Sequence, residues 1–523
     1  MTGSSGHRFS ILTPVYDPPV AALRAMIESV RAQTYENWQL VLVDDASPTP
    51  AVRRTLRAAA RSDHRITLVE RATNGGIVAA SDDALDAADG EFVALLDHDD
   101  LLVPAALQTM AAVTSAHDDV DYLYSDEDKL GADGTHFDVF RKPDWSPERL
   151  RCQMYTGHLS VLRTSLVRSV GGFEVGSDGS QDHDLVLRVT ERARRVVHIP
   201  EVLYHWRALV GSAALNPEAK PYAWEAGIRA VQRHLDRVGV NATVLPGRLP
   251  STYVIDRTFD PDTLISVVIP TRGTRGLVWG EWRTMVVEAV RSLLAKTHHP
   301  RIELVVVYDE PTPVAVLEQL RAVAGDRLVL VPFDEPFNFS AKCNVGFIAS
   351  SGDVVVFLND DMEVVSEGFP EQLVAPLSER GVVATGARLI FANGRLQHGG
   401  HVYAEGHLLH AGFSWPPDAE GPFGAMLVNR EASGLTAACL AVTRSTFERV
   451  GGFCEELPGN FNDVDLSRKL RRDGGRMLWL AGVTLHHFES QTRDSTVQEW
   501  EYAHIMRRWG TPKVDPYFPV GYR

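Results

Sequence analysis

The stretch EFVALLDHDD (residues 91–100) has a counterpart in DVVVFLNDDM (residues 353–362), and this pair decides the fold that the sequence predicts. In each stretch a short apolar run, typical of a buried strand, leads directly into acidic or amide side chains. Carboxylates at the end of a buried strand are unfavourable unless a cation or hydrogen bonds neutralise them. The two stretches therefore predict the same kind of polar site in each half of the chain.

Further features repeat in the same order around these two stretches. They are FSILTPVYD (9–17) with ISVVIPTRG (265–273), AALRAMIESVRAQT (21–34) with RTMVVEAVRSLLAKT (283–297), LVLVDDAS (40–47) with LVVVYDEP (304–311), and SVGGFE (169–174) with RVGGFC (449–454). Strands alternate with amphipathic helices, which predicts an α/β fold with a mostly parallel sheet, helices on both faces and ligands at the carboxyl ends of the strands. The Pro- and Asp-containing stretch 249–263 marks the predicted boundary between two tandem domains, 1–255 and 256–523.

Composition narrows the classes of partner. The 523 residues carry a formal net charge of −16 without a long run of Lys or Arg, which argues against nucleic acid as a partner. Anionic nucleotides remain compatible with this charge, because a metal ion and backbone N–H groups can hold phosphates. The four cysteines lack zinc-type spacing, and neither a signal peptide nor an 18-residue apolar run is present. We therefore expect a cytoplasmic protein, and peripheral association with the inner face of a membrane stays open.

The acidic motifs indicate a divalent cation. Asp97, Asp99 and Asp100 in the first half correspond to Asn359, Asp360 and Asp361 in the second. Hard oxygen ligands of this kind suit Mg²⁺ or Mn²⁺, usually shared with a diphosphate. The alternative is a turn or a helix cap, which Asp also favours. Recurrence of the group at the same place in both halves favours the metal site.

A second acidic cluster occurs in QDHDL (181–185) and NDVDL (462–466). Asp184 and Asp465 fit an acid that complements a helix dipole. Asp182 and Asp463 are less well explained in that way. A carboxylate close to a metal–diphosphate site could accept the proton of an acceptor hydroxyl as a general base, so these two acids are the candidate catalytic residues.

Matching histidines follow this cluster. His205 lies 23 residues after Asp182, and His487 lies 24 residues after Asp463. A lone histidine is usually structural, but one at matching distance in both halves is a candidate metal ligand. His486 is the alternative if the second half carries a one-residue slip.

Polar residues after the second strand of each half could hydrogen-bond a nucleotide. Asp45 and Asp309 have this position, but a turn explains DDAS (44–47) as well. NGG (74–76) and FNFSAKCN (337–344) similarly supply turn glycines or amide side chains before a helix.

Taken together, these residues resemble glycosyltransferase family 2, which has the GT-A fold, over nearly the whole chain. The resemblance rests on TPVY, QTYENWQLVLVDDAS, NGGI, DGEFVALLDHDDLL, YSDEDK, KPDWSPE, GSQDHDLVLR and HIPEVLYHWR in the first half, and on PFNFSAKCN, FLNDDMEV, QHGG, RVGGF, FNDVDL and HHFES in the second. The tandem arrangement is similar to that of bacterial enzymes that build surface polysaccharides.

The resemblance implies roles for particular residues. In the first half it implies nucleotide or donor contacts at Pro14, Asp45, Asn74 and Asp97, metal ligands at Asp99 and His205, and the catalytic base at Asp182. In the second half it implies donor contacts at Pro270, Asp309, Asn359 and Asp360, metal ligands at Asp361 and His487, and the base at Asp463. Asn359 replaces the first acid of the motif. The loops with Gly157, His158 and Gly434 would face the acceptor.

The predicted function is that of an inverting, metal-dependent glycosyltransferase with two active sites. The donor would be a UDP-, dTDP- or GDP-linked sugar, and the acceptor a glycan or a lipid-linked saccharide. One alternative keeps a single catalytic half and makes the other an acceptor-binding scaffold. A sugar-phosphate nucleotidyltransferase fits less well, because TPVYDPP and IPTRGTR are poor substitutes for a Gly-rich phosphate loop. A non-catalytic carbohydrate-binding protein would have no need of both bases and metal ligands.

Overall fold

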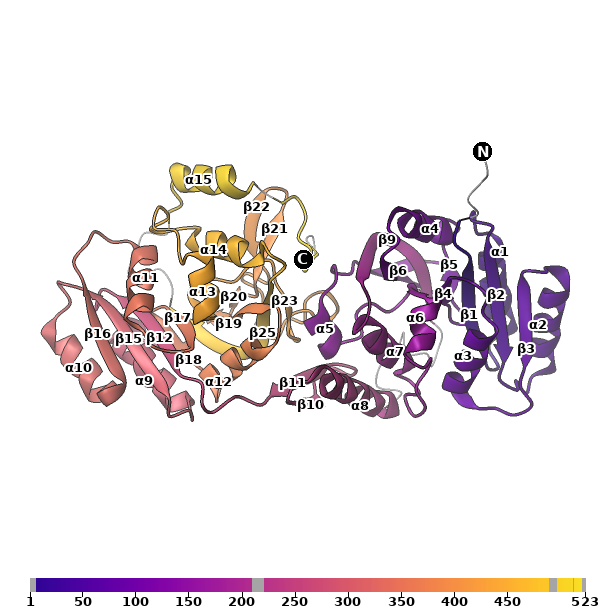
Figure 1. The fold of residues 1–523 in the computed structure, drawn as a ribbon, viewed down its shortest axis with the longest axis horizontal. Helices are drawn as coiled ribbons and strands as arrows, with labels where there is room; N and C mark the ends of the chain where they lie inside the picture. Colours follow the sequence, from indigo (N-terminus) through magenta and orange to yellow (C-terminus); the bar gives the residue numbers. More distant parts are fainter. Residues whose placement is uncertain (1–5, 209–220, 489–495, 511, 520–523) are drawn as a thin grey trace. The chain divides into compact units, whose positions relative to one another are not determined.

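A computed structural model describes residues 6–208, 221–488, 496–510 and 512–519 of the chain (Figure 1). The chain divides into two compact units. The first comprises Met1–Trp145 and Leu150–Ile255, and the second comprises Ser146–Arg149 and Asp256–Arg523. The short segment Ser146–Arg149 groups with the second unit, a feature that a single linear boundary does not predict.

The first unit is built on one large mixed sheet. Its strands are β1 (Phe9–Val15), β2 (Trp38–Asp44), β3 (Ile66–Glu70), β4 (Phe92–Leu95), β5 (Leu101–Leu102), β6 (Val120–Leu130), β7 (His136–Phe140), β8 (Ser160–Arg163) and β9 (Arg195–Arg207). Its helices are α1 (Val20–Arg31), α2 (Pro50–Ser62), α3 (Gly76–Asp86), α4 (Ala106–Ala116), α6 (Thr164–Ser169), α7 (Gln181–Thr190) and α8 (Pro221–Val238), and α5 (Pro147–Cys152) is divided between the two units. The strand order is β3-β2-β1-β4-β8-β6-β9-β5, with β7 paired to β6.

The second unit repeats this plan. Its strands are β12 (Ile265–Thr271), β13 (Arg275–Val278), β14 (Glu281–Thr284), β15 (Ile302–Asp309), β16 (Leu328–Phe333), β17 (Val354–Leu358), β18 (Met362–Val364), β19 (Val382–Phe391), β20 (Leu396–His398), β21 (His401–Ala404), β22 (His407–His410), β23 (Arg430–Glu431), β24 (Cys439–Thr443) and β25 (Arg476–His487). Its helices are α9 (Met285–Lys296), α10 (Val314–Ala324), α11 (Phe339–Ala349), α12 (Phe369–Val374), α13 (Arg444–Val450), α14 (Asn462–Arg471) and α15 (Glu499–Trp509). The order β16-β15-β12-β17-β24-β19-β25-β18 matches the first sheet strand for strand.

Both sheets are parallel in their first four strands and mixed beyond them. β1 pairs in parallel with β2 and β4, whereas β8 runs antiparallel to β4 and β6. β12 pairs in parallel with β15 and β17, and β24 is antiparallel to β17. The parallel strands all end at one edge, which is where an open α/β sheet binds its ligands.

Alternate side chains of the central strands serve two separate apolar cores. In the second unit Ile265, Val267 and Ile269 of β12 pack with α9 and α10 on one face of the sheet. Val268, between them, packs with α11, α13 and α14 on the other face. A strand buried on both faces reads as a continuous apolar run, which is why the sequence motifs before the acids are uniformly apolar.

Two glycines show how closely the copies agree. A Cβ at Gly90 would lie 2.6 Å from the backbone N of Ser10, and a Cβ at Gly352 would lie 2.6 Å from the backbone N of Ser266. Each glycine therefore allows the same close approach between the loop before the motif strand and the first strand of its unit.

The predicted fold class, two tandem α/β units with mostly parallel sheets, is confirmed, although the antiparallel strands β8 and β24 were not part of that prediction. The two-stranded sheet of β10 (Ala242–Pro246) and β11 (Tyr253–Arg257) occupies part of the stretch that was predicted to be a boundary. Within the described residues, the helices are too short or too polar to cross a membrane.

Candidate functional site

The carboxyl ends of the parallel strands bring together most of the predicted site residues. Pro14 and Pro270 hold the same register position, opposite Val43 and Val307 of the neighbouring strand. Both prolines line pockets at this edge of their sheets. The pocket of the first unit also contains Asp97 and that of the second also contains Asp360, so the sheet ends and the acidic motifs form common sites.

The polar contacts of Asp45 are with neighbouring residues of its own unit. Its buried carboxylate accepts hydrogen bonds from the backbone N–H groups of Gly75 (2.8 Å) and Gly76 (2.9 Å) and pairs with Arg71 at 3.0 Å. Asn74 is exposed, and its Oδ1 accepts a hydrogen bond from the N–H of Gly76 at 3.2 Å. Asp45 thus fixes the start of α3, next to the exposed Asn74.

Asp309 has an equivalent cationic partner that the sequence alone did not single out. Lys342 is buried, and its Nζ donates to Asp309 Oδ1 (2.6 Å) and to the carbonyl of Thr271 (2.7 Å). Lys342 comes from the FNFSAKCN motif, in which the sequence pattern points only to the amide side chains. Because Lys342 lines the same cavity as Asp360, it supplies a positive charge to the wall of that cavity.

The acids of the first motif differ in their surroundings. The Asp97 carboxylate is about half exposed, with Oδ2 3.9 Å from His158 Nε2. Asp100 is buried and accepts hydrogen bonds from the Tyr204 hydroxyl (2.6 Å) and the Arg207 N–H (2.7 Å). Burial, followed by the charge of Asp97, raises the pKa of Asp100 well above its usual value. Burial also raises the pKa of Asp99.

His158 joins this group, although the sequence placed it only on a loop facing the acceptor. One ligand atom each from Asp97, Asp100 and His158 lie within 4.8 Å of one another. Burial alone would lower the pKa of His158, but Glu127, with Nδ1 and Oε2 3.3 Å apart, and the nearby aspartates raise it to about 9. Burial would raise the pKa of Glu127, and Lys142 and His158 instead hold it at about 2. The histidine is therefore positioned by a buried carboxylate behind it.

Asp182 lies in the same small pocket, of about 30 Å³, as Pro14, Asp97 and His158. It stands in the first turn of α7. Burial and the negative charge of Asp97 raise the pKa of Asp182 to about 6, while the positive charge of His158 acts in the opposite direction. A carboxylate that titrates near neutrality is suited to accept and release a proton.

His205 contacts residues outside the acidic motif. Its Nδ1 lies 2.6 Å from Asp128 Oδ1, and its ring contacts that of His136, with centroids 4.3 Å apart. Asp128, His136 and His205 form a ligand-like group separate from the Asp97 group. The structure thus does not bring His205 into an ion pair with Asp97 or Asp99, because alternation along β9 turns it away from Tyr204, which reaches Asp100.

In the second unit the predicted histidine does meet the acidic motif. His487 Nε2 lies 3.0 Å from Asp361 Oδ1 and 3.4 Å from Asn359 Nδ2, and its Nδ1 lies 2.7 Å from Gln397 Oε1. Asp360 turns the other way and accepts a hydrogen bond from Thr271 at 2.6 Å. Burial and the neighbouring Asp361 raise the pKa of Asp360 to about 7.

Strand register shows why the two histidines differ. Leu101 lies opposite His205, and Glu363 lies opposite His486. Leu101 and Glu363 each stand four positions after the first residue of their motif. The sheets therefore equate His205 with His486, whereas His487 is the histidine that reaches the motif.

Asp463 faces a much larger site. It lines a cavity of about 410 Å³ together with the acidic motif and His487. Asp463 Oδ2 lies 3.7 Å from His401 Nε2 and accepts a long hydrogen bond of 3.4 Å from the Ala437 N–H. The same cavity is lined by His398 and His410, which the sequence reasoning missed, although QHGG contained the first of them.

The other acid of each cluster is structural. Asp184 is fully buried and pairs with Arg188 (2.6 Å) and Arg233 (2.9 Å). Asp465 is also buried and pairs with Lys469 (3.0 Å) and with other side chains of its unit. Both acids hold their helix to its neighbours, and neither lines the pocket that contains the candidate base.

The chain is similar to several known proteins. The family model described as Glycosyl transferase family 2 matches residues 10–171 and 266–451. The uncharacterized protein y4gI of Sinorhizobium fredii is 40% identical over 97% of this chain and 56% of its own length. The O-antigen biosynthesis protein RfbC of Myxococcus xanthus is 35% identical over 97% of this chain and 40% of its own length. The chain thus spans about half the length of these relatives.

Among solved structures, residues 1–349 of TarS from S. aureus are similar, with 20% sequence identity and a TM-score of 0.35. The similarity covers 44% of this chain and 65% of that one.

Proposed function

Since the chain belongs to glycosyltransferase family 2, we propose that both of its units transfer sugars from nucleotide-diphosphate donors with inversion at the anomeric carbon. We propose that the acceptor is a glycan or a lipid-linked saccharide that is being extended into a bacterial surface polysaccharide. The name of the O-antigen biosynthesis relative supports this acceptor class.

One observation carries the proposal. In each unit a carboxylate from the start of a helix, Asp182 or Asp463, shares a pocket with the acidic motif at the ends of the parallel strands. A binding protein needs no proton acceptor beside a cluster of cation ligands, whereas a transferase needs both. This pairing, present twice in one chain, supports two active sites.

The proposed chemistry assigns the proton transfer to the helix carboxylates. Asp182 or Asp463 accepts the proton of an acceptor hydroxyl as its oxygen forms a bond to the anomeric carbon of the donor. The bond between that carbon and the diphosphate oxygen breaks, and the electron pair leaves with the nucleoside diphosphate. Attack from the face opposite to the leaving group inverts the anomeric centre.

The residues present fit a divalent cation. In the second unit a carboxylate, an imidazole and an amide meet at Asp361, His487 and Asn359. In the first unit Asp97 offers a half-exposed carboxylate with His158 beside it, and Asp99 offers a second carboxylate, 3.9 Å from His98 Nε2. Mg²⁺ or Mn²⁺ held there would stabilise the negative charge that develops on the leaving diphosphate. We propose Asp99 and Asp361 as the principal ligands, and Pro14, Asp45, Asn74, Pro270 and Asp309 as the surroundings of the nucleotide.

The pKa of Asp182 predicts the pH dependence of the first unit. Asp182 acts as a base only when ionised, so kcat/KM should rise between pH 5 and 7 with an inflection at about 6. A cation at Asp97 removes part of the charge that raises this pKa, so the inflection should move to lower pH as the metal concentration increases. Initial rates in an Asp463→Asn background would record the first unit alone. A profile that is flat over this range, or an inflection that metal moves upward, would contradict the assignment.

A donor screen tests the proposed substrate class. Thermal unfolding of the full chain should be recorded with UDP-, dTDP- and GDP-sugars, with and without Mn²⁺. A ligand at 100 times its dissociation constant stabilises a folded protein by about 2.7 kcal/mol, so a true donor should raise the melting temperature in a concentration-dependent way. The double variant Asp99→Asn, Asp361→Asn should lose the part of the shift that depends on metal. Absence of any shift with every donor would contradict the proposal.

A second candidate function has one observation in its favour. The cavity of the second unit, at about 410 Å³, is much larger than the pocket of about 30 Å³ in the first. The alternative is therefore that only the second unit transfers sugar and that the first unit is an acceptor-binding scaffold. The experiments must distinguish this alternative from transfer by both units.

A further inference from the structure

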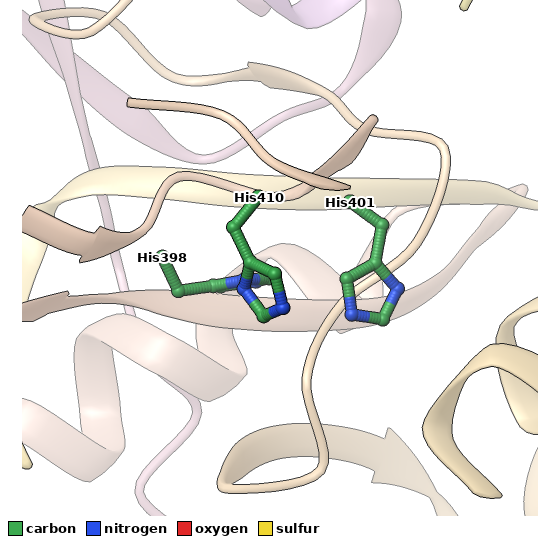
Figure 2. A group of neighbouring side chains, drawn as sticks. All are labelled: His398, His401 and His410. Atoms are coloured by element: carbon green, nitrogen blue, oxygen red, sulfur yellow. The ribbon is translucent and has the colours of Figure 1, made fainter. Parts of the chain in front are cut away.

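Three histidines of the second unit converge on the wall of its cavity, outside the acidic motif. Figure 2 shows the imidazole rings of His398, His401 and His410 turned toward one another. They come from the end of β20, the start of β21 and the end of β22. One nitrogen from each ring lies within 4.8 Å of the other two, and the ring centroids are 4.8–5.3 Å apart.

The environment of the trio resembles that of metal ligands. His398 and His401 are almost completely buried, while His410 is partly exposed. His401 Nε2 lies 3.7 Å from Asp463 Oδ2, and a carboxylate beside a ligating imidazole is a common feature of metal sites. All three rings line the cavity, so an ion among them would have an open coordination position facing the substrate space.

Hydrogen bonds use only some of the ring nitrogens of the three histidines. His398 Nδ1 and His410 Nδ1 are 2.7 Å apart, which is a single hydrogen bond sharing one proton. The N–H of Thr436 donates to His398 Nε2 at 3.3 Å. The ring of His401 packs against the other two rings, and its Nε2 lies within ion-pair distance of Asp463 Oδ2. The cluster thus gathers more nitrogen lone pairs than its hydrogen bonds use.

We propose that His398, His401 and His410 bind a first-row transition-metal ion of the Zn²⁺ type, separate from the Mg²⁺ or Mn²⁺ of the acidic motif. Imidazole nitrogens select zinc, nickel or copper, whereas carboxylates and water suit magnesium and manganese. With Zn–N bonds of about 2.0–2.1 Å, two ligating nitrogens stand roughly 3.3 Å apart, so the pair at 2.7 Å must open slightly. His410, the partly exposed member at the end of its strand, can rotate to allow this.

The bound ion would have two consequences for the second unit. It would tie together β20, β21 and β22, which contribute one ligand each. It would also place a positive charge beside Asp463 through the His401 contact. The proposal does not depend on transfer activity, since its test reads metal binding directly.

Cobalt provides the probe. The full chain, freed of metal by a chelator, should be titrated with Co²⁺ and followed by visible absorption. The expected result is one Co²⁺ with the intense bands of a four-coordinate, nitrogen-rich site, displaced by one equivalent of Zn²⁺. His410→Ala should weaken this binding by on the order of 100-fold or more. His407→Ala is the matched control, because His407 is an exposed histidine on the same strand and should leave the spectrum unchanged.

Two further variants make the outcome decisive. His410→Gln removes the imidazole but keeps a polar side chain, so it replaces His410→Ala if that variant fails to fold. Asp361→Asn should leave the cobalt bands intact, because Asp361 belongs to the donor motif. Absence of intense bands in the unaltered chain would overturn the proposal. Bands that disappear in Asp361→Asn but persist in the His410 variants would overturn it as well, since the ion would then occupy the acidic motif.

Discussion

Replacing Asp182 by Asn is expected to lower the turnover of the first unit by roughly 10²–10⁴-fold, the usual contribution of a general base. Asn keeps the size of the side chain and its place at the start of α7 but cannot accept the proton of the acceptor hydroxyl. The variant should fold normally. Because the pKa of Asp182 is raised to about 6, the ionised form destabilises the folded state as the pH rises through that value, and Asn carries no such charge. Its melting temperature at pH 8 should therefore equal or exceed that of the unaltered chain.

The rate should be measured in an Asp463→Asn background, with the donor and acceptor at saturation. Glu174→Gln is a suitable control, because Glu174 is an exposed carboxylate on the loop before α7. An Asp182→Asn variant that retains more than a tenth of the rate would exclude Asp182 as the base. A fall in melting temperature that accompanies the loss of rate would instead mean that the residue is structural.

Asp184→Ala should have the opposite pattern, with a large loss of stability. Asp184 is fully buried between Arg188 and Arg233, and removing one partner of a buried ion pair costs about 3–5 kcal/mol because the remaining charges are left without compensation. For a unit of about 250 residues this corresponds to a fall in melting temperature of roughly 6–20 °C. Differential scanning calorimetry of the full chain should show the transition of the first unit move down.

The equivalent variant in the second unit provides a matched comparison. Asp465 is buried with Lys469 as its partner, so Asp465→Ala should lower the transition of the second unit and leave that of the first in place. If neither variant moves a transition by more than 1–2 °C, these ion pairs contribute little and the helix-dipole explanation suffices. Two acids that stand two residues apart in one motif would thus be separated into a chemical and a structural role.

The sequence was sufficient to predict the fold because its local signals agree. Apolar runs such as FVALL and VVVFL, the helices after the first strand of each unit, and the glycines before the motifs all recur in order. The strand orders of the two sheets correspond throughout. The antiparallel insertion of β8 between β4 and β6 was not predictable, because pairing between strands far apart in the chain leaves little trace in local pattern.

The candidate site was predicted less completely. The motif acids and the helix carboxylates were accessible to sequence reasoning because each follows directly from a strand end or a helix start. The histidines were not, because their positions depend on register. Sequence spacing makes His487 the counterpart of His205. The strand register instead makes His486 the counterpart of His205. A shift of one residue along a strand turns a side chain to the other face, so counting from a distant motif cannot settle which histidine reaches the acids.

Residues that long-range packing brings in were missed for a related reason. His158 reaches Asp97 from the loop before β8, and Lys342 reaches Asp309 from α11. The histidine trio is assembled from three short strands that follow β19. The sequence around a lone histidine or lysine does not indicate which residue it will contact. Only the position of the side chain in the folded unit shows that contact.

The central claim is that the chain contains two independent transferase sites, and separate inactivation of the bases tests it most directly. The sugar products of the unaltered chain, of Asp182→Asn, of Asp463→Asn and of the double variant should be compared with the donors identified by thermal shift. We predict that each single variant loses a different transfer and that the double variant loses both. If one single variant abolishes every product while the other abolishes none, only one unit is catalytic and the claim is contradicted.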